Sequence, residues 1–317
     1  MNNTTISVTD FLLHCEVNAD QTSMITIFLT LVYILSVCGN LLVIFVIVSN
    51  PKLHAPMYMY IGTLAVIDMC NSTILIPKML SLLISNATDV PYGACLLQMY
   101  VILNMEEMES LLLAFMAIDR YAAVVHPLRY NTIFTNKTIW IIILLLNIFA
   151  IFFNSPFLFF ANELSFCRSN ILPYCFCDYA TMVHVACTEN PKYLFLLSIV
   201  VIITGVFPLL LILFSYGRIA LAALKITSAD GRKKVISTCL THLLVVGLFY
   251  IPLLSSYILP GAGVPMSTEV YNAMVIVGNV FPPMMNPIIY SFRNKEINTS
   301  IINLFGKKRT IPEINNH

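Results

Sequence analysis

Charged residues are scarce in this chain. Only 10% of its 317 residues are Asp, Glu, Lys or Arg, whereas 58% are hydrophobic and the mean hydropathy is +0.84. Soluble domains carry about 25% charged residues, so the composition excludes an ordinary soluble domain and indicates a membrane protein. The formal net charge of +1 also argues against nucleic acid as a partner.

Signatures of enzymes and transporters are missing too. The sequence contains no His-Glu-x-x-His zinc motif and no Gly-x-Ser-x-Gly nucleophile turn, and its six histidines are scattered. Internal repeats with paired broken helices, which are typical of transporters, are not visible. The sequence therefore favours a protein that is neither an enzyme nor a transporter.

Seven apolar runs occupy most of the chain. A membrane span needs about 20 apolar residues, and the runs lie at about 24–49, 57–83, 95–125, 138–161, 193–224, 234–259 and 269–292. The third is interrupted by acids and the seventh by prolines, which indicates packing or function rather than lipid contact. We predict an all-α membrane protein, with a seven-transmembrane helix bundle over residues 24–292.

Lys and Arg predict the orientation of this bundle. With the N-terminus outside, fourteen basic residues fall on inner segments and only three, Lys78, Arg168 and Lys192, on outer ones. Basic residues accumulate on the cytoplasmic side. We therefore expect an extracellular segment 1–23, a cytoplasmic segment 293–317, and a multi-pass protein without a cleavable signal peptide.

Two features of the flanking segments fit this orientation. Asn2, Asn3 and Asn86 open glycosylation sequons in segments placed outside. After the seventh span, apolar residues at 297, 301, 304 and 305 follow helical spacing. That spacing predicts a short amphipathic helix on the inner leaflet, followed by a basic tail.

One stretch near the end of the third span stands out. Met116-Ala-Ile-Asp119-Arg120-Tyr121 is followed by an aliphatic patch and by His126-Pro127-Leu-Arg129-Tyr130. A charged pair is costly in hydrocarbon, so Asp119 and Arg120 are expected at a membrane edge. The stretch resembles the MAYDRYVAICHPLRY signature of vertebrate odorant receptors, with Ile118 in place of tyrosine.

Further motifs of this family follow in order and with the right spacing. They include Gly39-Asn40, Pro56-Met-Tyr58, Leu64-Ala-Val-Ile-Asp68, Ser215-Tyr216, Lys233 to His242, and Pro283-Met-Met-Asn286-Pro287-Ile-Ile-Tyr290. The resemblance implies a class A G-protein-coupled receptor of the plasma membrane. Such a receptor binds a small-molecule odorant and activates a stimulatory heterotrimeric G protein, which raises cyclic AMP. A non-olfactory class A receptor for a small ligand is the alternative.

The long outer loop, from about 162 to 192, contains four of the nine cysteines: Cys167, Cys175, Cys177 and Cys187. The bare sequence permits several pairings of these with each other and with Cys95. The resemblance implies Cys95–Cys177 and Cys167–Cys187. Cys175 is then left over, and Cys15 is expected to be free.

The resemblance also implies which residues switch the receptor. Asp119 would hold Arg120 at rest and release it when the inner ends of spans three and six separate, which admits a G-protein helix. Tyr216 and Tyr290 would reorganise around Arg120, and Asn286 and Pro287 belong to the same inner motif. The simpler interpretation is an ion pair that only positions a helix.

Asp68, Glu109 and Asn286 are polar residues placed within the membrane. Mid-membrane carboxylates usually face a polar interior, and Glu109 precedes Arg120 by eleven residues, about three helical turns. The resemblance suggests that the three residues bind a sodium ion. Alternatively, the two carboxyl groups share a proton.

Glu106 and Glu107 are individual features of this chain. Glu106 lies on the same helix face as Glu109, roughly 21 Å above Arg120, and Glu107 points about 100° away. We expect Glu106, with Glu107, to attract a cationic or strongly hydrogen-bonding ligand. Alternatively, they are protonated and bonded to hydroxyls such as that of Thr204. The other expected pocket residues are Ile102, Met105, Tyr250, Leu253, Tyr257 and Asn279.

Overall fold

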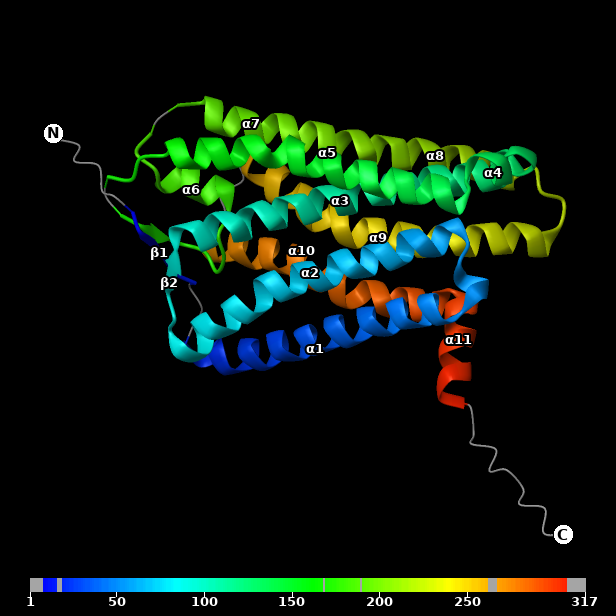
Figure 1. Cartoon of the computed structure of the whole chain (residues 1–317), viewed down its shortest axis with the longest axis horizontal. Helices are drawn as coiled ribbons and strands as arrows, with labels where there is room; N and C mark the ends of the chain where they lie inside the picture. Colours follow the sequence, from blue (N-terminus) through cyan, green and yellow to red (C-terminus); the bar gives the residue numbers. More distant parts are fainter. Residues whose placement is uncertain (1–7, 16–18, 168, 189, 262–266, 307–317) are drawn as a thin grey trace, which may run out of the picture.

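The computed structural model is a bundle of long helices with a small sheet at one end (Figure 1). It describes residues 8–15, 19–167, 169–188, 190–261 and 267–306. Asn2, Asn3 and the basic tail 307–309 lie outside these residues. We refer to the two ends of the bundle as the sheet end and the α11 end.

Seven segments run along the bundle. They are α1 (Ala19–Ser49), α2 (Pro56–Ser85), α3 (Tyr92–Val125), α5 (Asn136–Glu163), the continuous α7 (Lys192–Val200), η2 (Val201–Val206) and α8 (Phe207–Ala223), α9 (Ala229–Gly261) and α10 (Thr268–Arg293). Six of these segments in the described part of the chain are long and apolar enough to cross a membrane. The exception is α3, which carries four acidic side chains and Arg120 yet lies between α2, α5 and α8.

Local sequence explains where several helices begin and end. Pro56 and Pro127 stand at the first position of α2 and α4 (Pro127–Ile133), where a missing amide proton costs nothing. Thr135 and Ser267 cap α5 and α10 by accepting backbone N–H groups with their side chains. Asn86 ends α2 in the left-handed conformation with φ 48°, which asparagine tolerates better than most residues.

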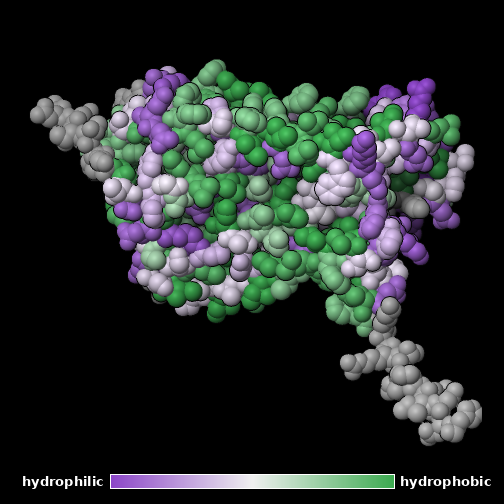
Figure 2. Space-filling view, in the orientation of Figure 1, coloured by the Kyte–Doolittle hydropathy of each residue, from purple (hydrophilic) through white to green (hydrophobic). Residues whose placement is uncertain are grey.

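The outside of the bundle is apolar. Side chains such as Phe152 and Phe195 are about 72% and 66% exposed, and green hydrophobic residues cover the middle of the surface while hydrophilic residues gather at its ends (Figure 2). An exposed apolar surface of this extent fits the hydrocarbon of a bilayer. The expected seven-transmembrane helix bundle is confirmed.

Helices approach closely where small residues allow it. A Cβ atom on Gly278 of α10 would lie 2.9 Å from Cβ of Pro252 on α9, so only glycine fits this contact. Within the fifth span, η2 is a π-helical turn, a distortion that frees backbone groups and is frequent at functional sites.

The sheet end was not predicted from the sequence. Strand β1 (Asp10–Leu13) pairs antiparallel with β2 (Asp89–Pro91) and parallel with β3 (Ile171–Leu172). Phe11 and Leu13 of β1 are fully buried beneath the loops. The short α6 (Tyr179–Val185), also unpredicted, lies in the same long loop as β3.

At the opposite end, η1 (Pro51–Leu53) and α4 connect the long helices. The predicted amphipathic helix is α11 (Lys295–Gly306), which runs across the bundle direction (Figure 1). Ile297 is fully buried, whereas Phe305 is 74% exposed. Asn50 donates a 2.7 Å hydrogen bond to Ser300, and Tyr58 donates one to Glu296, so α11 is anchored to the bundle.

Candidate functional site

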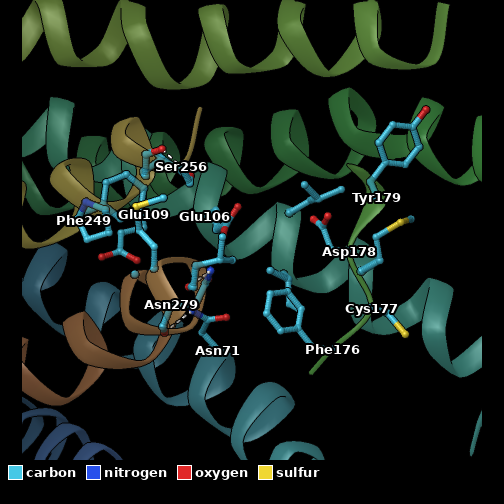
Figure 3. A pocket seen from close by; sticks show the side chains of 18 of the residues that line it. Asn71, Glu106, Glu109, Phe176, Cys177, Asp178, Tyr179, Phe249, Ser256 and Asn279 are labelled. Atoms are coloured by element: carbon cyan, nitrogen blue, oxygen red, sulfur yellow. Dashed lines mark hydrogen bonds between the residues drawn. The ribbon is translucent and has the colours of Figure 1, made fainter. Parts of the chain in front are cut away.

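A cavity opens between the helices in the half of the bundle near the sheet end (Figure 3). Its empty space, open mouth included, is about 840 Å³. Its walls come from α2, α3, α6, α7, α9, α10 and the long loop. The lining includes Asn71, Ile102, Leu103, Glu106, Glu109, Phe176, Asp178, Tyr179, Phe249, Leu253, Ser256, Tyr271 and Asn279.

Three carboxyl groups line this first cavity. Glu106 and Glu109 come from α3, and Asp178 comes from the long loop, on the opposite side of the cavity in Figure 3. The described lining contains no Lys, Arg or His side chain. The cavity is therefore acidic, with apolar and aromatic walls.

A second, smaller cavity adjoins the first along α3, α5 and η2. Glu106 lines both cavities, and Glu107, Asn154 and Thr204 line the second. Asn154 Nδ2 donates a 2.7 Å hydrogen bond to Glu107 Oε2, while Glu107 Oε1 has no hydrogen-bond partner among the described residues. Glu107 thus faces the fourth span, away from the first cavity.

Polar contacts connect α3 to its neighbours just below these cavities. Ser110 donates a hydrogen bond to the carbonyl of Thr204, in the π-helical turn. The Tyr250 hydroxyl lies 2.8 Å from Ser110 Oγ and donates to it, because the Ser110 proton is already used. Ser110 therefore joins α3, η2 and α9 at one point.

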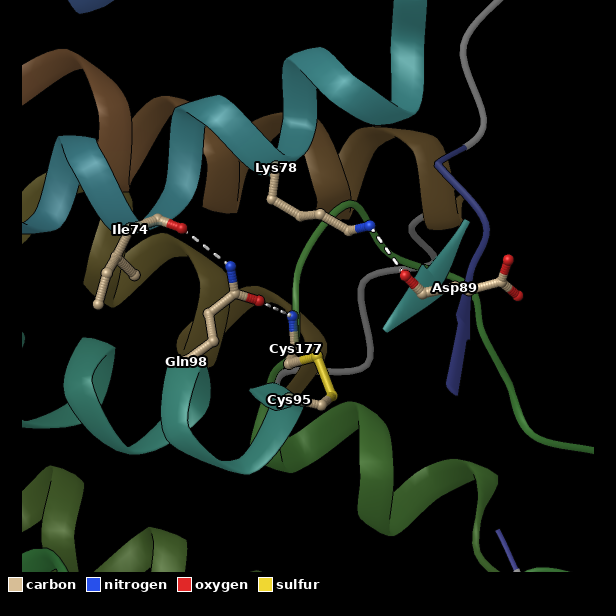
Figure 4. Close-up of a disulfide and its surroundings, with 6 residues drawn as sticks. All are labelled: Ile74, Lys78, Asp89, Cys95, Gln98 and Cys177. Carbon is tan, nitrogen blue, oxygen red and sulfur yellow. Dashed lines mark hydrogen bonds between the residues drawn. A yellow bond between two sulfur atoms is a disulfide. The ribbon is translucent and has the colours of Figure 1, made fainter. Parts of the chain in front are cut away.

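The loop over the first cavity is tied to α3 by a disulfide and an amide (Figure 4). Cys95 at the start of α3 pairs with Cys177. Gln98 Oε1 accepts the Cys177 N–H at 3.0 Å, and its Nε2 donates to the carbonyl of Ile74 on α2 at 3.0 Å. These contacts fix the backbone directly beside Asp178.

Asp178 is itself held in place by α6. Its Oδ2 accepts both the N–H and the hydroxyl of Thr181, each at 3.0 Å, so it caps this helix. Burial raises the pKa of the Asp178 carboxyl, and the Thr181 hydrogen bonds oppose that effect. The carboxyl group is thus both desolvated and oriented.

Two further disulfides lie at the sheet end. Cys167 pairs with Cys187, as the family resemblance implied. The expectation that Cys15 is free and Cys175 left over was wrong, because these two cysteines pair with each other. The pairing follows from the sheet, which brings the N-terminal strand alongside the long loop.

Most of the residues expected to bind ligand line one of the two cavities. Ile102, Glu106, Leu253 and Asn279 line the first, and Glu107 and Thr204 the second. Met105 and Tyr250 do not line either cavity and pack in the core instead. The side chain of Tyr257 lies outside the described part of the chain.

Asp178, Phe176, Tyr271 and Ser256 line the first cavity but were not predicted. The two loop residues flank Cys177, so the expected Cys95–Cys177 disulfide was a signal that would have placed them over α3. For Ser256 and Tyr271, the only sequence signal was their position on the sixth and seventh predicted spans.

The α11 end of α3 holds the Asp119–Arg120 pair. Arg120 Nη2 lies 3.9 Å from Asp119 Oδ2, and Tyr130 of α4 donates a 2.9 Å hydrogen bond to Asp119 Oδ1. Asp119 is buried, whereas the Arg120 side chain is 20% exposed. The carboxylate is therefore shared between the arginine and the tyrosine.

Tyr216 and Tyr290 lie near this pair without bonding to it. The Tyr216 hydroxyl is 2.5 Å from His242 Nδ1, which links α8 to α9. Tyr290 is buried, and its hydroxyl has no hydrogen-bond partner among the described residues. His242 was not among the switch residues predicted from the sequence.

Asp68, Glu109 and Asn286 come together in the middle of the bundle. Asn286 Nδ2 donates to both carboxylate oxygens of Asp68, at 3.3 and 3.0 Å. Glu109 Oε1 and Asn286 Oδ1 are buried oxygens without a hydrogen-bond partner among the described residues. Oxygen donors of this kind suit a hard cation such as sodium.

The arrangement of helices matches that of a known receptor structure. The crystal structure of squid rhodopsin superposes with a TM-score of 0.74, covering 92% of this chain and 87% of that chain at 17% sequence identity. The fold is therefore that of a rhodopsin-like seven-helix receptor.

Sequence comparison identifies the family. The family model described as "Olfactory receptor" matches residues 29–308. Olfactory receptor 1496 of Rattus norvegicus is 35% identical over 305 residues, which cover 95% of this chain and 97% of the relative. Olfactory receptor 1E1 of Pan troglodytes is 34% identical over 305 residues and covers 96% of each chain.

This chain belongs to the olfactory receptor family. Its members are multi-pass membrane G-protein-coupled receptors, and so it is a signalling receptor rather than an enzyme.

Proposed function

We propose that this receptor binds a small-molecule odorant in the first cavity and activates a stimulatory heterotrimeric G protein, which raises cyclic AMP. The observation that supports this most is the construction of α3. One continuous helix carries Glu106 in the cavity wall and the Asp119–Arg120 pair at its other end. A ligand at one end can therefore act on the helix that holds the pair at the other.

The sheet end is the extracellular end in this proposal. All three disulfides lie there, and disulfides persist in oxidising compartments. The exposed Asn86 lies at the same end and is the glycosylation site we propose within the described residues. The α11 end then faces the cytoplasm, as the Lys and Arg distribution favours, and the protein resides in the plasma membrane.

Arg120 is the coupling residue. At rest Asp119 holds it, while Tyr216 is engaged by His242 of α9. Separation of α9 from α3 would break the Tyr216–His242 contact, free Tyr216 and Tyr290 to turn toward Arg120, and open a cleft for the G-protein helix. The ligand drives this change only by binding the open conformation more tightly.

Sodium at Asp68, Glu109 and Asn286 is part of the proposal. The partnerless oxygens of Glu109 and Asn286 would serve as ligands, and the ion's single positive charge would offset one of the two carboxylate charges of Asp68 and Glu109. Because Glu109 also lines the first cavity, a sodium ion bound to it would change the electrostatic potential in the odorant site.

Cyclic AMP measurement in cells that express the chain tests this function. We expect one or more small molecules to raise cyclic AMP in a dose-dependent manner, with an epitope tag on the N-terminus detected at the surface of intact cells. A well-expressed receptor that signals only through another second messenger would contradict the stimulatory coupling.

A further inference from the structure

The first cavity has an unbalanced charge. Glu106, Glu109 and Asp178 line it, and no basic side chain is present among the described lining residues. Carboxylates that share a desolvated site repel one another, and they need a positive partner to remain ionised. None of the described lining residues supplies such a partner, although the positive charge of His184, outside the lining, lowers the pKa of the Asp178 carboxyl against the effect of burial.

Buried oxygen atoms in the same cavity also lack partners. Glu109 Oε1 and Asn71 Oδ1 belong to side chains that are 4% exposed, and neither accepts a hydrogen bond from a described residue. The sodium ion proposed above would satisfy Glu109 Oε1 but not Asn71 Oδ1. Both residues line the cavity. The groups left unsatisfied are acceptors, so the complementary ligand is a donor, and an ammonium group is a donor with three N–H groups and no acceptor.

The walls of the cavity suit a cation with an organic body. Ile102 and Leu253 supply apolar surface, and the rings of Phe176, Phe249 and Tyr271 also face this space. Aromatic faces attract cations. No group of three His, Cys, Asp or Glu side chains that could hold a metal ion occurs in the described part of the chain, and the apolar and aromatic walls suit an organic cation.

The loop carboxylate is held in position before a ligand arrives. Thr181 holds Asp178 from one side, and the Cys95–Cys177 disulfide fixes the preceding residue. Glu106 projects from the rigid helix α3. Two carboxylates on fixed supports bind a cation without paying much ordering entropy.

We propose that the odorant is a protonated organic amine whose ammonium group lies between the carboxylates of Glu106 and Asp178. Its apolar body packs against Ile102, Leu253 and the aromatic rings. This inference rests on the proposed function, since it names the chemical class of the ligand for that site.

Matched ligands of three charge types test the proposal. The first set is phenethylamine, phenethyl alcohol and phenylacetate; the second is hexylamine, hexanol and hexanoate; the third is cyclohexylamine, cyclohexanol and cyclohexanecarboxylate. Each compound is tested on the full-length receptor by cyclic AMP in cells and by the thermal stability of the purified protein. The thermal measurement reports binding whether or not a G protein couples.

Amines are expected to raise cyclic AMP and the melting temperature, and the matched alcohols and carboxylates are not. Glu106→Gln and Asp178→Asn keep the side-chain shape and remove one charge each, and each should raise the EC50 for amines about tenfold or more. Glu269→Gln is the control, because Glu269 is an exposed acid at the sheet end of α10. It should leave the EC50 unchanged.

Three results would overturn the proposal of an amine ligand. Alcohols or carboxylates that act as well as amines overturn the proposal, as does an amine response that survives both charge-removing variants. A surface-expressed parent that no amine stabilises or activates also overturns it. The amine proposal and the proposed stimulatory coupling can fail independently. If amines stabilise the protein but do not raise cyclic AMP, only the proposed coupling is contradicted. If only neutral ligands raise cyclic AMP, only the proposal of an amine ligand is contradicted.

Discussion

The two ends of α3 carry acidic side chains in opposite situations. Near the sheet end, Glu106 and Glu109 face a cavity whose described lining has no basic residue. Near the α11 end, Asp119 is paired with Arg120 and Tyr130. An acid with its partner in the same chain can hold a conformation, whereas an acid without one is open to a partner from outside. This difference supports the proposal that the sheet end of α3 binds the ligand and that its α11 end stabilises the resting conformation.

Loss of the arginine should have the largest effect. Arg120→Ala leaves Asp119 without its cation and removes the proposed coupling residue, so evoked cyclic AMP should fall to the level of cells without receptor. A dose–response curve at matched surface expression measures this.

Arg218→Ala is the control, since Arg218 is an exposed basic residue on α8. It should keep most of the response. A normal response from Arg120→Ala would show that the ion pair merely positions a helix.

Removing the unpredicted disulfide should weaken the sheet end. The double variant Cys15→Ser, Cys175→Ser opens a loop of 160 residues, and loss of a disulfide typically costs about 2–4 kcal/mol of unfolding free energy. We expect the melting temperature of the purified receptor to fall by several degrees. Cys38→Ser, at a free and exposed cysteine, is the control. Equal melting temperatures for the double variant and the parent would mean that the Cys15–Cys175 disulfide contributes nothing to the stability of the folded receptor.

Gln98 tests whether the loop must be positioned for ligand binding. Gln98→Ala removes the hydrogen bonds to Cys177 and Ile74, so Asp178 loses part of its support. One hydrogen bond is worth about 1 kcal/mol, and we expect the EC50 of an active ligand to rise about threefold to tenfold with the maximal response unchanged. Gln21→Ala, an exposed glutamine of α1, should have no effect. A lower maximal response with the same EC50 would place Gln98 in signalling rather than in binding.

The smallest effect is expected at the contact between α8 and α9. His242→Leu removes the partner of Tyr216, which loosens the resting arrangement, and basal cyclic AMP should rise about twofold. Thr241→Val is the matched control, because the Thr241 hydroxyl donates to the carbonyl of Ser237 within its own helix, its one hydrogen bond among the described residues. If basal cyclic AMP falls instead, the contact belongs to the active state.

Much of the fold was predictable from the sequence because the membrane imposes a simple pattern. Apolar runs of sufficient length identified the long helices, and α3 was recognised despite its acids because its motif fixed its place. The amphipathic spacing after residue 293 identified α11. These signals are local and strong.

The missed features depend on contacts between distant segments. The Cys15–Cys175 pair and the three-stranded sheet join the N-terminal segment to a loop about 160 residues away, and no local pattern reveals such pairing. Asp178 was overlooked because a loop residue has no helical periodicity to direct it toward a cavity. Tyr250 was placed in the pocket from its position on α9, but its bond to Ser110 holds it in the core.

We propose that ligand binding and G-protein coupling reside at separate ends of α3. The most direct test measures amine binding, by thermal shift, and cyclic AMP for Glu106→Gln and Arg120→Ala side by side. We predict that Arg120→Ala keeps the thermal shift and loses cyclic AMP, while Glu106→Gln requires about tenfold or more amine for the same thermal shift and for the same evoked cyclic AMP. Loss of binding in Arg120→Ala, or an unchanged thermal shift in Glu106→Gln, would contradict the division between the two ends.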